Sequence, residues 1–286
     1  MVRLSILAIS ALATCLPSTF AHPANTIRNI ERFGCGTEPS EAFLNKTREI
    51  SRQEKSRFSS KSKASFGAAA KNLTIQTYFH VVARDKTVAG GYVPQASLDK
   101  QLSVLNDNFG KSSTRSWSLL KLILDIAPHG VHFDLKGIDW TVNAKWAVDA
   151  NGNELAMKKA LRKGPYKALN VYFLYDLGDN LGYCYFPTDA AKGSEDFWID
   201  GCAIQFSTVP GGSLANFNQG KTTTHEVGHW FGLQHTFEGG CDGLGDEMAD
   251  TPAQDTSSQG CPVGRDSCPD REGLDPIHNY MDYSYE

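Results

Sequence analysis

Eleven residues from His225 to His235 constrain the fold of this chain more than any other stretch of its sequence. His225 and His229 are four residues apart, so a helix places both imidazoles on one face, where they can bind one metal ion. Glu226 lies beside them and can hold a water molecule without binding the metal itself. Gly232 lets the backbone turn sharply out of the helix, which brings His235 round as a third ligand. Three protein ligands leave one position open, which is typical of catalytic rather than structural zinc.

A helix whose histidines merely cap it or fill space is the alternative to a metal site. At average residue usage, however, this combination of residues at this spacing arises by chance in roughly one chain in tens of thousands. The spacing therefore favours metal binding. It also predicts a helix over residues 222–233, which should stop at Gly232 or just after it.

The N-terminus has the pattern of a secretory signal peptide over residues 1–21. A short start with Arg3 precedes an apolar run over residues 4–16 that is too short to span a bilayer, and the small residues up to Ala21 suit cleavage. A buried N-terminal helix is the alternative. Because no later apolar stretch is long enough to anchor the chain, we expect a secreted, extracellular protein without a membrane partner.

The cysteines and two glycosylation sequons suit an oxidising compartment. Cys15 leaves with the signal peptide and Cys35 stands alone, whereas the other five gather in the C-terminal half: Cys184, Cys202, Cys241, Cys261 and Cys268. Such clustering is typical of disulfide-bonded regions. Asn45 and Asn72 begin the sequons and are the predicted glycosylation sites, although sequons are also common by chance.

Charge divides the chain into a basic leader and an acidic body. Residues 22–71 hold ten Lys and Arg against five Asp and Glu, whereas residues 72–286 hold seventeen against twenty-seven. The two parts can therefore attract each other. The body has no basic stripe of the size that nucleic-acid binding requires, so we expect no nucleic-acid partner.

Hydrophobic periodicity gives a coarse map of the elements. Residues 51–70 are rich in Ser, Lys, Arg and Ala and predict an exposed, protease-sensitive linker. Residues 74–82 alternate as a half-buried strand, with Ile75, Thr77, Phe79 and Val81 on one face. Further elements are predicted at residues 97–108 (helix), 131–135 (strand), 154–162 (helix) and 169–175 (strand). From residue 238 onward Gly, Pro, Asp, Ser and Cys dominate, which predicts loops held by disulfides or ions.

The extended histidine motif resembles that of the metzincin clan of zinc metalloproteases. Asn279-Tyr280-Met281-Asp282-Tyr283 is similar to the clan's Met-turn, and Arg32-Phe33-Gly34-Cys35-Gly36-Thr37 resembles the pro-segment motif of the pappalysin family. Residues 182–187, 209–213, 240–241 and 250–252 are similar to the fungal extracellular members of that family. The resemblance implies an α+β fold, with a twisted mixed β-sheet, two main helices above the cleft and an irregular disulfide-bonded C-terminal subdomain.

The resemblance also implies roles for individual residues. His225, His229 and His235 would bind Zn²⁺ and Glu226 would be the catalytic base. Met281 would form the floor beneath the metal, and Tyr283 would hydrogen-bond the developing oxyanion; without the zinc motif, a core methionine and a surface aromatic would be preferred. The protein would then be a monomeric endopeptidase that hydrolyses protein or peptide substrates.

Cys35 is predicted to be a cysteine switch. Its thiolate would occupy the open zinc position and keep the precursor latent; an unpaired cysteine without a role is the alternative. Residues 22–71 are accordingly expected to form a pro-segment with a linker, and residues 72–286 the catalytic domain. Cleavage of this pro-segment would activate a zymogen.

The family pattern pairs Cys241 with Cys268, and Cys184 with Cys202 is the natural second pair, although sequence alone does not fix the connectivity. Cys261 is left over, because its family partner lies shortly after the Met-turn and this chain ends at Glu286. A shortened C-terminus is therefore expected. It raises the alternative of a catalytically inactive, secreted zinc-binding protein, against which the retained Glu226 argues.

Two further segments leave alternatives open. The acidic residues Asp242, Asp246, Glu247, Asp250 and Asp255 could bind Ca²⁺, or could form a solvated loop. Residues 111–128 interrupt the family pattern and are either an inserted hairpin or a retained intron that has been translated. Substrate specificity cannot be derived from these residues.

Overall fold

The computed structural model describes residues 34–60, 71–110, 126–248 and 251–286. All of these belong to one unit, Arg32–Glu286. The expected signal peptide, most of the segment 111–128 and Asp250 lie outside the described residues. None of the described helices is both long and apolar enough to cross a membrane.

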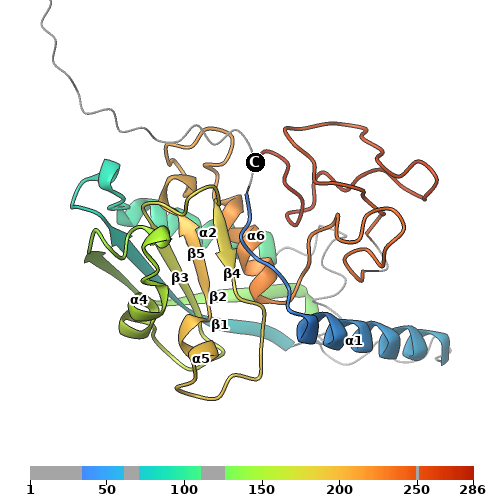
Figure 1. Ribbon diagram of the computed structural model, residues 1–286, viewed down its shortest axis with the longest axis horizontal. Helices are drawn as coiled ribbons and strands as arrows, with labels where there is room; N and C mark the ends of the chain where they lie inside the picture. The colour runs from blue at the N-terminus through green and yellow to red at the C-terminus, as the bar shows by residue number, and fades with distance from the viewer. Residues whose placement is uncertain (1–33, 61–70, 111–125, 249–250) are drawn as a thin grey trace, which may run out of the picture. The chain divides into compact units, whose positions relative to one another are not determined.

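The fold is organised around a five-stranded sheet with the strand order β2-β1-β3-β5-β4 (Figure 1). Its strands are β1 (Lys71–Ala83), β2 (Ile126–Val142), β3 (Leu169–Leu174), β4 (Gly182–Cys184) and β5 (Cys202–Gln205). The first four strands in this order pair in parallel, and β4 pairs with β5 in antiparallel orientation. The short antiparallel strand β4 is therefore an edge of the sheet.

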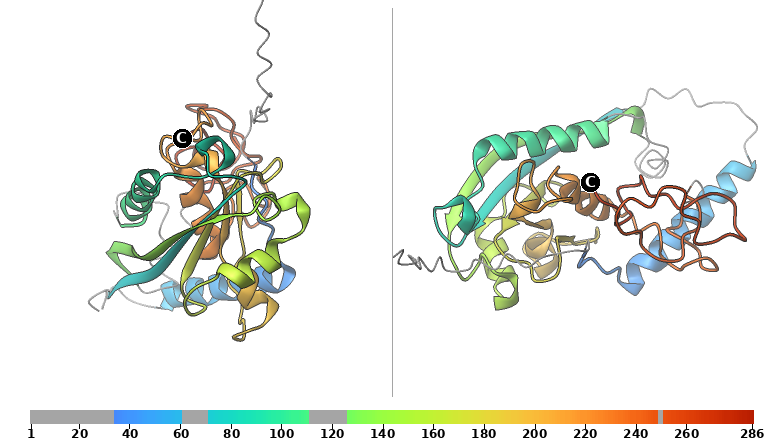
Figure 2. Two further views of the ribbon diagram at one scale, coloured as in Figure 1. Left: turned by 90° about the vertical axis from the view of Figure 1, so that its left-hand side faces the viewer. Right: turned by 90° about the horizontal axis from the view of Figure 1, so that it is seen from above.

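Helices cover both faces of this sheet (Figure 2). α2 (Gln95–Gly110) and α6 (Lys221–Trp230) contribute Leu98, Leu105 and Val227 to the larger core on one face. α4 (Glu154–Leu161) adds Met157 to a smaller core on the other face, and α5 (Glu195–Ile199) packs against α4. Single turns of 3-10 helix lie at η1 (Val88–Gly90), η3 (Asp149–Asn151) and η4 (Phe206–Thr208).

β1 confirms the predicted strand and corrects its expected exposure. The inward face of alternating residues, Ile75 to Val81, is buried as predicted. His80 and Val82 on the opposite face are also fully buried, because Tyr172 and the smaller core cover that face. The strand is therefore half-buried only in its first half.

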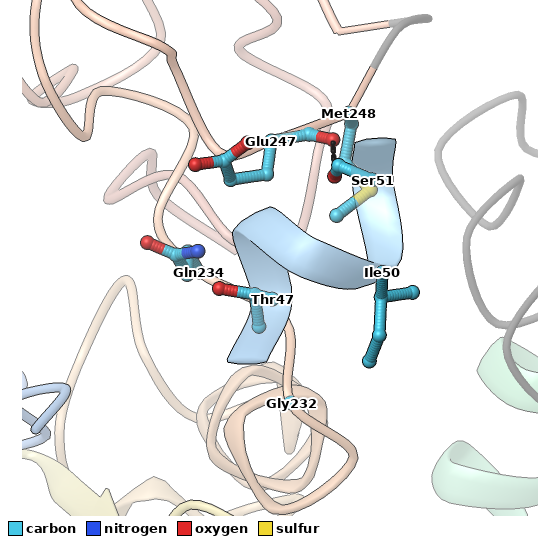
Figure 3. Close-up of a pocket in the computed structure, with 7 residues that line it drawn as sticks. All are labelled: Thr47, Ile50, Ser51, Gly232, Gln234, Glu247 and Met248. Atoms are coloured by element: carbon cyan, nitrogen blue, oxygen red, sulfur yellow. Dashed lines mark hydrogen bonds between the residues drawn. The ribbon is translucent and has the colours of Figure 1, made fainter. Parts of the chain in front are cut away.

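The structure differs most clearly from the prediction over residues 51–60, which were expected to form part of a linker. α1 (Glu41–Ser60) runs through residues 51–60, and only residues 61–70 lie outside the described part. Neither Gly nor Pro interrupts these residues, and Lys, Arg, Glu and Gln are good helix formers. Figure 3 shows Thr47, Ile50 and Ser51 of this helix beside Gln234 and Met248. Packing against the rest of the chain thus adds to the helix propensity.

The predicted helices and β3 lie close to their predicted positions, whereas β2 extends well beyond the predicted strand at residues 131–135. α6 ends three residues before the predicted limit, and Gly232 follows it with a left-handed φ of 95°. β2 begins at Ile126, so the last residues of the expected insertion form part of the sheet rather than a separate hairpin. A register shift between Lys71 and Leu73 of β1 accommodates them.

The described chain after Trp230 contains no helix or strand, as predicted. Cys241 is joined to Cys268 and Cys184 to Cys202, whereas Cys261 is exposed and outside any disulfide. The disulfide Cys184–Cys202 joins β4 to β5.

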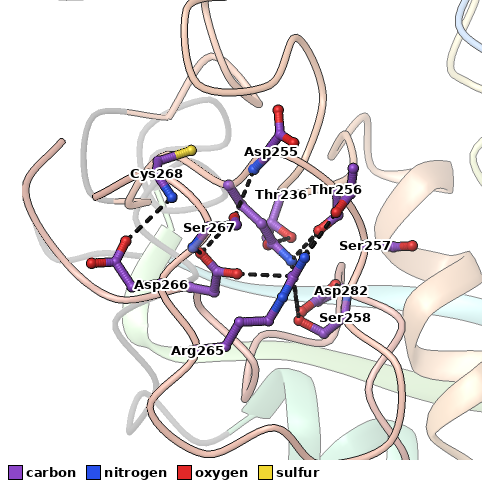
Figure 4. A network of polar contacts seen from close by, with 12 residues as sticks. Thr236, Asp255, Thr256, Ser257, Ser258, Arg265, Asp266, Ser267, Cys268 and Asp282 are labelled. Atoms are coloured by element: carbon purple, nitrogen blue, oxygen red, sulfur yellow. Dashed lines mark hydrogen bonds and ion pairs between the residues drawn. The ribbon is translucent and has the colours of Figure 1, made fainter. Parts of the chain in front are cut away.

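A polar network supports this irregular part (Figure 4). Arg265 forms a buried ion pair with Asp275 (Nη1 to Oδ2, 2.8 Å) and donates to the carbonyl of Thr256 (2.8 Å). It also donates to Ser258, whose backbone N–H bonds Asp282 Oδ1 at 2.9 Å. The residue after Met281 is thereby tied to the disulfide-bonded loops.

Candidate active site

Three histidines converge at the end of α6. His225 and His229 lie on one face of this helix, and the turn at Gly232 brings His235 to them. His229 Nε2 lies 3.1 Å from His225 Nε2 and 3.1 Å from His235 Nε2. All three side chains are buried. The sequence motif therefore forms the predicted constellation.

The second ring nitrogen of each histidine meets an acceptor. His225 Nδ1 lies 2.6 Å from the carbonyl of Tyr280, His229 Nδ1 lies 2.7 Å from the carbonyl of Leu233, and His235 Nδ1 lies 3.0 Å from Glu238 Oε1. These contacts place the proton on Nδ1 and leave the Nε2 lone pairs directed at the common centre. Burial, together with the neighbouring histidine charge, holds the pKa of His225 and His229 well below the usual range. The imidazoles are thus kept in the neutral form that a metal ligand needs.

These residues fit a metal ion. The ligand atoms of Cys35, His225, His229 and His235 all lie within 4.8 Å of one another. Imidazole nitrogen and thiolate sulfur are the ligands that Zn²⁺ prefers, and four of them suit its tetrahedral coordination. Lone pairs converging without a donor between them would otherwise repel one another.

Glu226 lies beside this centre and is completely buried. Its Oε2 accepts a hydrogen bond from Thr37 Oγ1 at 3.2 Å and lies 3.5 Å from Cys35 Sγ. Burial raises the pKa of Glu226 to about 8, although the hydrogen bonds from Cys35 and Thr37 lower it. Gly182 of β4 leaves room for the carboxylate, because a Cβ there would lie 2.6 Å from Glu226 Cγ.

Met281 and Tyr283 lie at the same centre. Met281 is buried against α6, and a Cβ added at Gly228 would approach its Sδ to 2.4 Å. The glycine therefore permits close packing of the Met-turn beneath the histidines. Tyr283 OH lies 3.2 Å from His235 Nε2, and burial raises the pKa of this phenol. The structure thus brings both residues to the histidine cluster.

The segment around Cys35 pairs with the edge strand β4. Leu181 N donates to Gly34 O (2.7 Å) and Gly36 N donates to Gly182 O (3.0 Å), which forms a parallel bridge. This pairing directs Cys35 Sγ to within 3.4 Å of His229 Nε2. Burial and the adjacent Glu226 carboxylate raise the pKa of the thiol. A Cβ at Gly34 would lie 2.4 Å from the carbonyl of Asp179, so the glycine before the cysteine allows this approach.

Sequence reasoning missed several residues of this site. Thr37 bridges Glu226 and the backbone N–H of Cys184 (3.0 Å), and Gly182 makes room for the carboxylate. The Glu238 carboxylate, three residues after His235, carried a spacing signal that could have been found. The carbonyls of Leu233 and Tyr280 carried none, because every residue has one.

Other predicted sites are not gathered here. Asp242 pairs with Arg271 (3.1 Å) and Glu247 with Arg48 (3.7 Å), while Asp250 lies outside the described residues. Within the described ranges, the acidic loop forms no cluster of three or more candidate ligands, and Ca²⁺ stays a prediction. Asn45 is exposed on α1, and Asn72 lies in β1.

Comparison with known proteins agrees with this geometry. The family described as Pregnancy-associated plasma protein-A, a peptidase family, matches residues 158–286. An extracellular metalloprotease of Sordaria macrospora is 53% identical over 91% of this chain and 84% of its own length. One from Neurospora crassa is 48% identical over 96% of this chain and 87% of its own length. The chain belongs to this family of fungal extracellular metalloproteases.

A solved structure supports the same assignment. Mature mirolysin of Tannerella forsythia, in complex with a cleaved peptide, is 25% identical, with a TM-score of 0.59 over 76% of this chain and 86% of that one. The predicted α+β metzincin fold and membership of the pappalysin family are confirmed. This protein is therefore a metalloendopeptidase, and its family implies zinc as the metal.

Proposed function

We propose that this metalloprotease is a secreted, zinc-dependent endopeptidase made as a zymogen, with His225, His229 and His235 as the zinc ligands. The convergence of three buried Nε2 atoms beside a buried carboxylate carries this proposal. Extracellular relatives and the signal-like N-terminus support secretion.

Zinc, when bound, supplies a Lewis acid that lowers the pKa of water and polarises a carbonyl group. Glu226 accepts the proton of the attacking water and passes it to the leaving amine, as a general base and then a general acid. Tyr283 donates a hydrogen bond to the oxyanion of the tetrahedral intermediate, and Met281 packs beneath the ligands.

Latency follows from the position of Cys35. Its sulfur lies at the ligand cluster, and Thr37 occupies Glu226 with a hydrogen bond. A substrate cannot reach either group while residues 34–36 of the pro-segment, proposed as residues 22–71, pair with β4. Removal of this segment frees the catalytic domain, proposed as residues 72–286. Asn45 and Asn72 are the proposed glycosylation sites.

Hydrolysis of casein by the processed protein tests this function. We expect activity that a zinc chelator abolishes and that Glu226→Ala removes, whereas Glu195→Ala, an exposed acidic residue on α5, leaves it unchanged. Zinc content, measured on the same samples by mass spectrometry, should stay at one ion per chain in Glu226→Ala. Activity that survives both chelation and Glu226→Ala would refute the proposal.

The intact precursor tests latency. Cys35→Ala should hydrolyse casein without processing, while Cys261→Ala, which removes an exposed cysteine that forms no disulfide, should stay as latent as the wild type. Equal latency of the Cys35→Ala and wild-type precursors would reject the cysteine switch.

A further inference from the structure

Helix α1 has two distinct faces over its first three turns. The side chains turned toward the rest of the protein are buried or half-buried: Phe43, Leu44, Thr47, Arg48, Ile50 and Ser51. The side chains between them are exposed: Glu41, Ala42, Asn45, Lys46, Glu49 and Arg52. Spacings of three and four residues define an amphipathic helix. This helix therefore packs through a specific face.

An aromatic contact anchors the beginning of α1. The ring of Phe43 stacks on that of Phe186 at a centroid distance of 4.2 Å, and Phe186 in turn meets the His229 ring edge-on at 5.4 Å. A Cβ at Gly232 would lie 3.6 Å from the Phe43 ring, so the turn after α6 passes directly beneath it. Aromatic pairs of this kind stabilise a contact beyond the area that they bury.

Polar contacts anchor the next two turns. Ser51 Oγ donates to the carbonyl of Glu247 at 3.2 Å, and Arg48 Nε lies 3.7 Å from Glu247 Oε1. The Glu247 side chain is only 10% exposed, so water screens this ion pair less than a surface pair. Glu247 also has a left-handed φ of 64°, a conformation that a non-glycine residue keeps only where its surroundings hold it. The contacts with α1 supply part of that support.

These contacts define a surface that we name the α1 seat: Phe186, Gly232, Gln234, Glu247 and Met248. Phe186 follows β4, Gly232 and Gln234 follow α6, and Glu247 and Met248 belong to the acidic loop. Figure 3 shows the last four around Thr47, Ile50 and Ser51. None of them is a metal ligand, and none is paired with Cys35. The seat therefore lies outside the contacts of the thiol itself, although Phe186 also meets the His229 ring.

We propose that the α1 seat is a second docking site for the pro-segment, independent of Cys35. The seat binds an amphipathic helix that presents an aromatic residue to Phe186 and a basic residue to Glu247. This inference rests on the proposed zymogen. Its occupant is α1 itself. A cut in the chain after Ser60 then leaves the pro-segment bound, and the enzyme is released only when α1 leaves its seat.

Hydrogen exchange of the intact chain tests this docking site. All forms carry Glu226→Gln, which prevents self-processing and keeps an acceptor for Thr37. One form adds Cys35→Ala, a second adds Phe43→Ala with Ile50→Asp on the packed face, and a third adds Asn45→Ala with Arg52→Asp on the exposed face. Most of the stability of a helix in a protein comes from packing of its amphipathic face, so slow exchange of its amides reports docking.

We expect amides 43–51 to keep their protection in the Cys35→Ala form and in the exposed-face form. The packed-face form should lose it by about tenfold or more, while amides of β1 and β3 stay protected and show that the chain is folded. Loss of α1 protection in the Cys35→Ala form would overturn the proposal, as would full protection in the packed-face form. This measurement does not depend on hydrolysis. An enzyme that fails to hydrolyse casein would refute the proposed function, whereas the docking site is judged on the protection of the α1 amides alone.

Discussion

Gly182→Ala tests whether Glu226 acts in the position that the fold gives it. Gly182 lies in β4, and a Cβ there would be 2.6 Å from Glu226 Cγ, 2.8 Å from Oε1 and 2.9 Å from Cδ. Ordinary contacts begin near 3.4 Å, so the carboxylate must move by about 0.8 Å to relieve the clash. Displacing a catalytic group by about 1 Å costs roughly 10²-fold in rate, and overpacking of this kind costs about 1–3 kcal/mol of stability.

The assay compares initial rates of casein hydrolysis and thermal midpoints for processed Gly182→Ala and Gly137→Ala. Gly137 also lies in a strand of the sheet, but its added Cβ would meet only Tyr78 Cδ1 at 3.8 Å. We expect a rate loss of about 10²-fold for Gly182→Ala and almost none for Gly137→Ala, because only the first displaces Glu226. If Gly182→Ala hydrolyses casein at the wild-type rate, Glu226 does not act from this position and the reasoning fails.

Three further predictions follow from other contacts. Asp139 is partly buried, which raises its pKa, but hydrogen bonds and charge from His80 (3.0 Å) and Lys163 (2.6 Å) outweigh this and lower it. Its contribution to stability is present above the unfolded pKa of about 4 and is lost as pH falls through the lower folded value. Asp139→Asn should therefore lower the melting temperature at pH 6 and hardly at pH 2, and an equal loss at both would contradict this. Glu286 Oε1 accepts from the backbone N–H of Thr222 (2.7 Å) and caps α6, which has no side-chain cap of its own; Glu286→Ala should cost about 1 kcal/mol, seen as a melting temperature lower by about 2–4 °C. Tyr283→Phe should lower kcat by about 10²-fold while zinc content and melting temperature stay unchanged, and a wild-type kcat would exclude the oxyanion role.

The convergence of the three histidines could be predicted because its geometry is local. The spacing of His225 and His229 on a helix, and the turn that Gly232 permits, depend on few neighbours. The acceptors of their Nδ1 atoms could not be predicted in the same way. Two of them are backbone carbonyls, and one of these, on Tyr280, comes from a part of the chain 55 residues away.

Helix α1, in contrast, was not predicted from the sequence. Residues 51–60 have few large apolar groups, so composition alone predicts an exposed linker. The packed face of the helix depends on partners such as Phe186 and Glu247, which are more than 100 residues distant in the chain. Helix-forming residues at 51–60 and long-range contacts of residues 43–51 thus act together in α1. The second buried face of β1 was missed for the same reason, because its cover comes from β3 and α4.

The hydrogen bond between His225 and the Tyr280 carbonyl affects when the site can be completed during synthesis of the chain. A ribosome makes the Cys35 segment before the histidines, and the histidines before the Met-turn. Because the carbonyl that orients His225 and the methionine beneath the ligands both belong to the Met-turn, the centre cannot be completed until that stretch has been synthesised. By then the proposed pro-segment has already been made. A finished centre that lacks this segment would therefore arise only by its later removal.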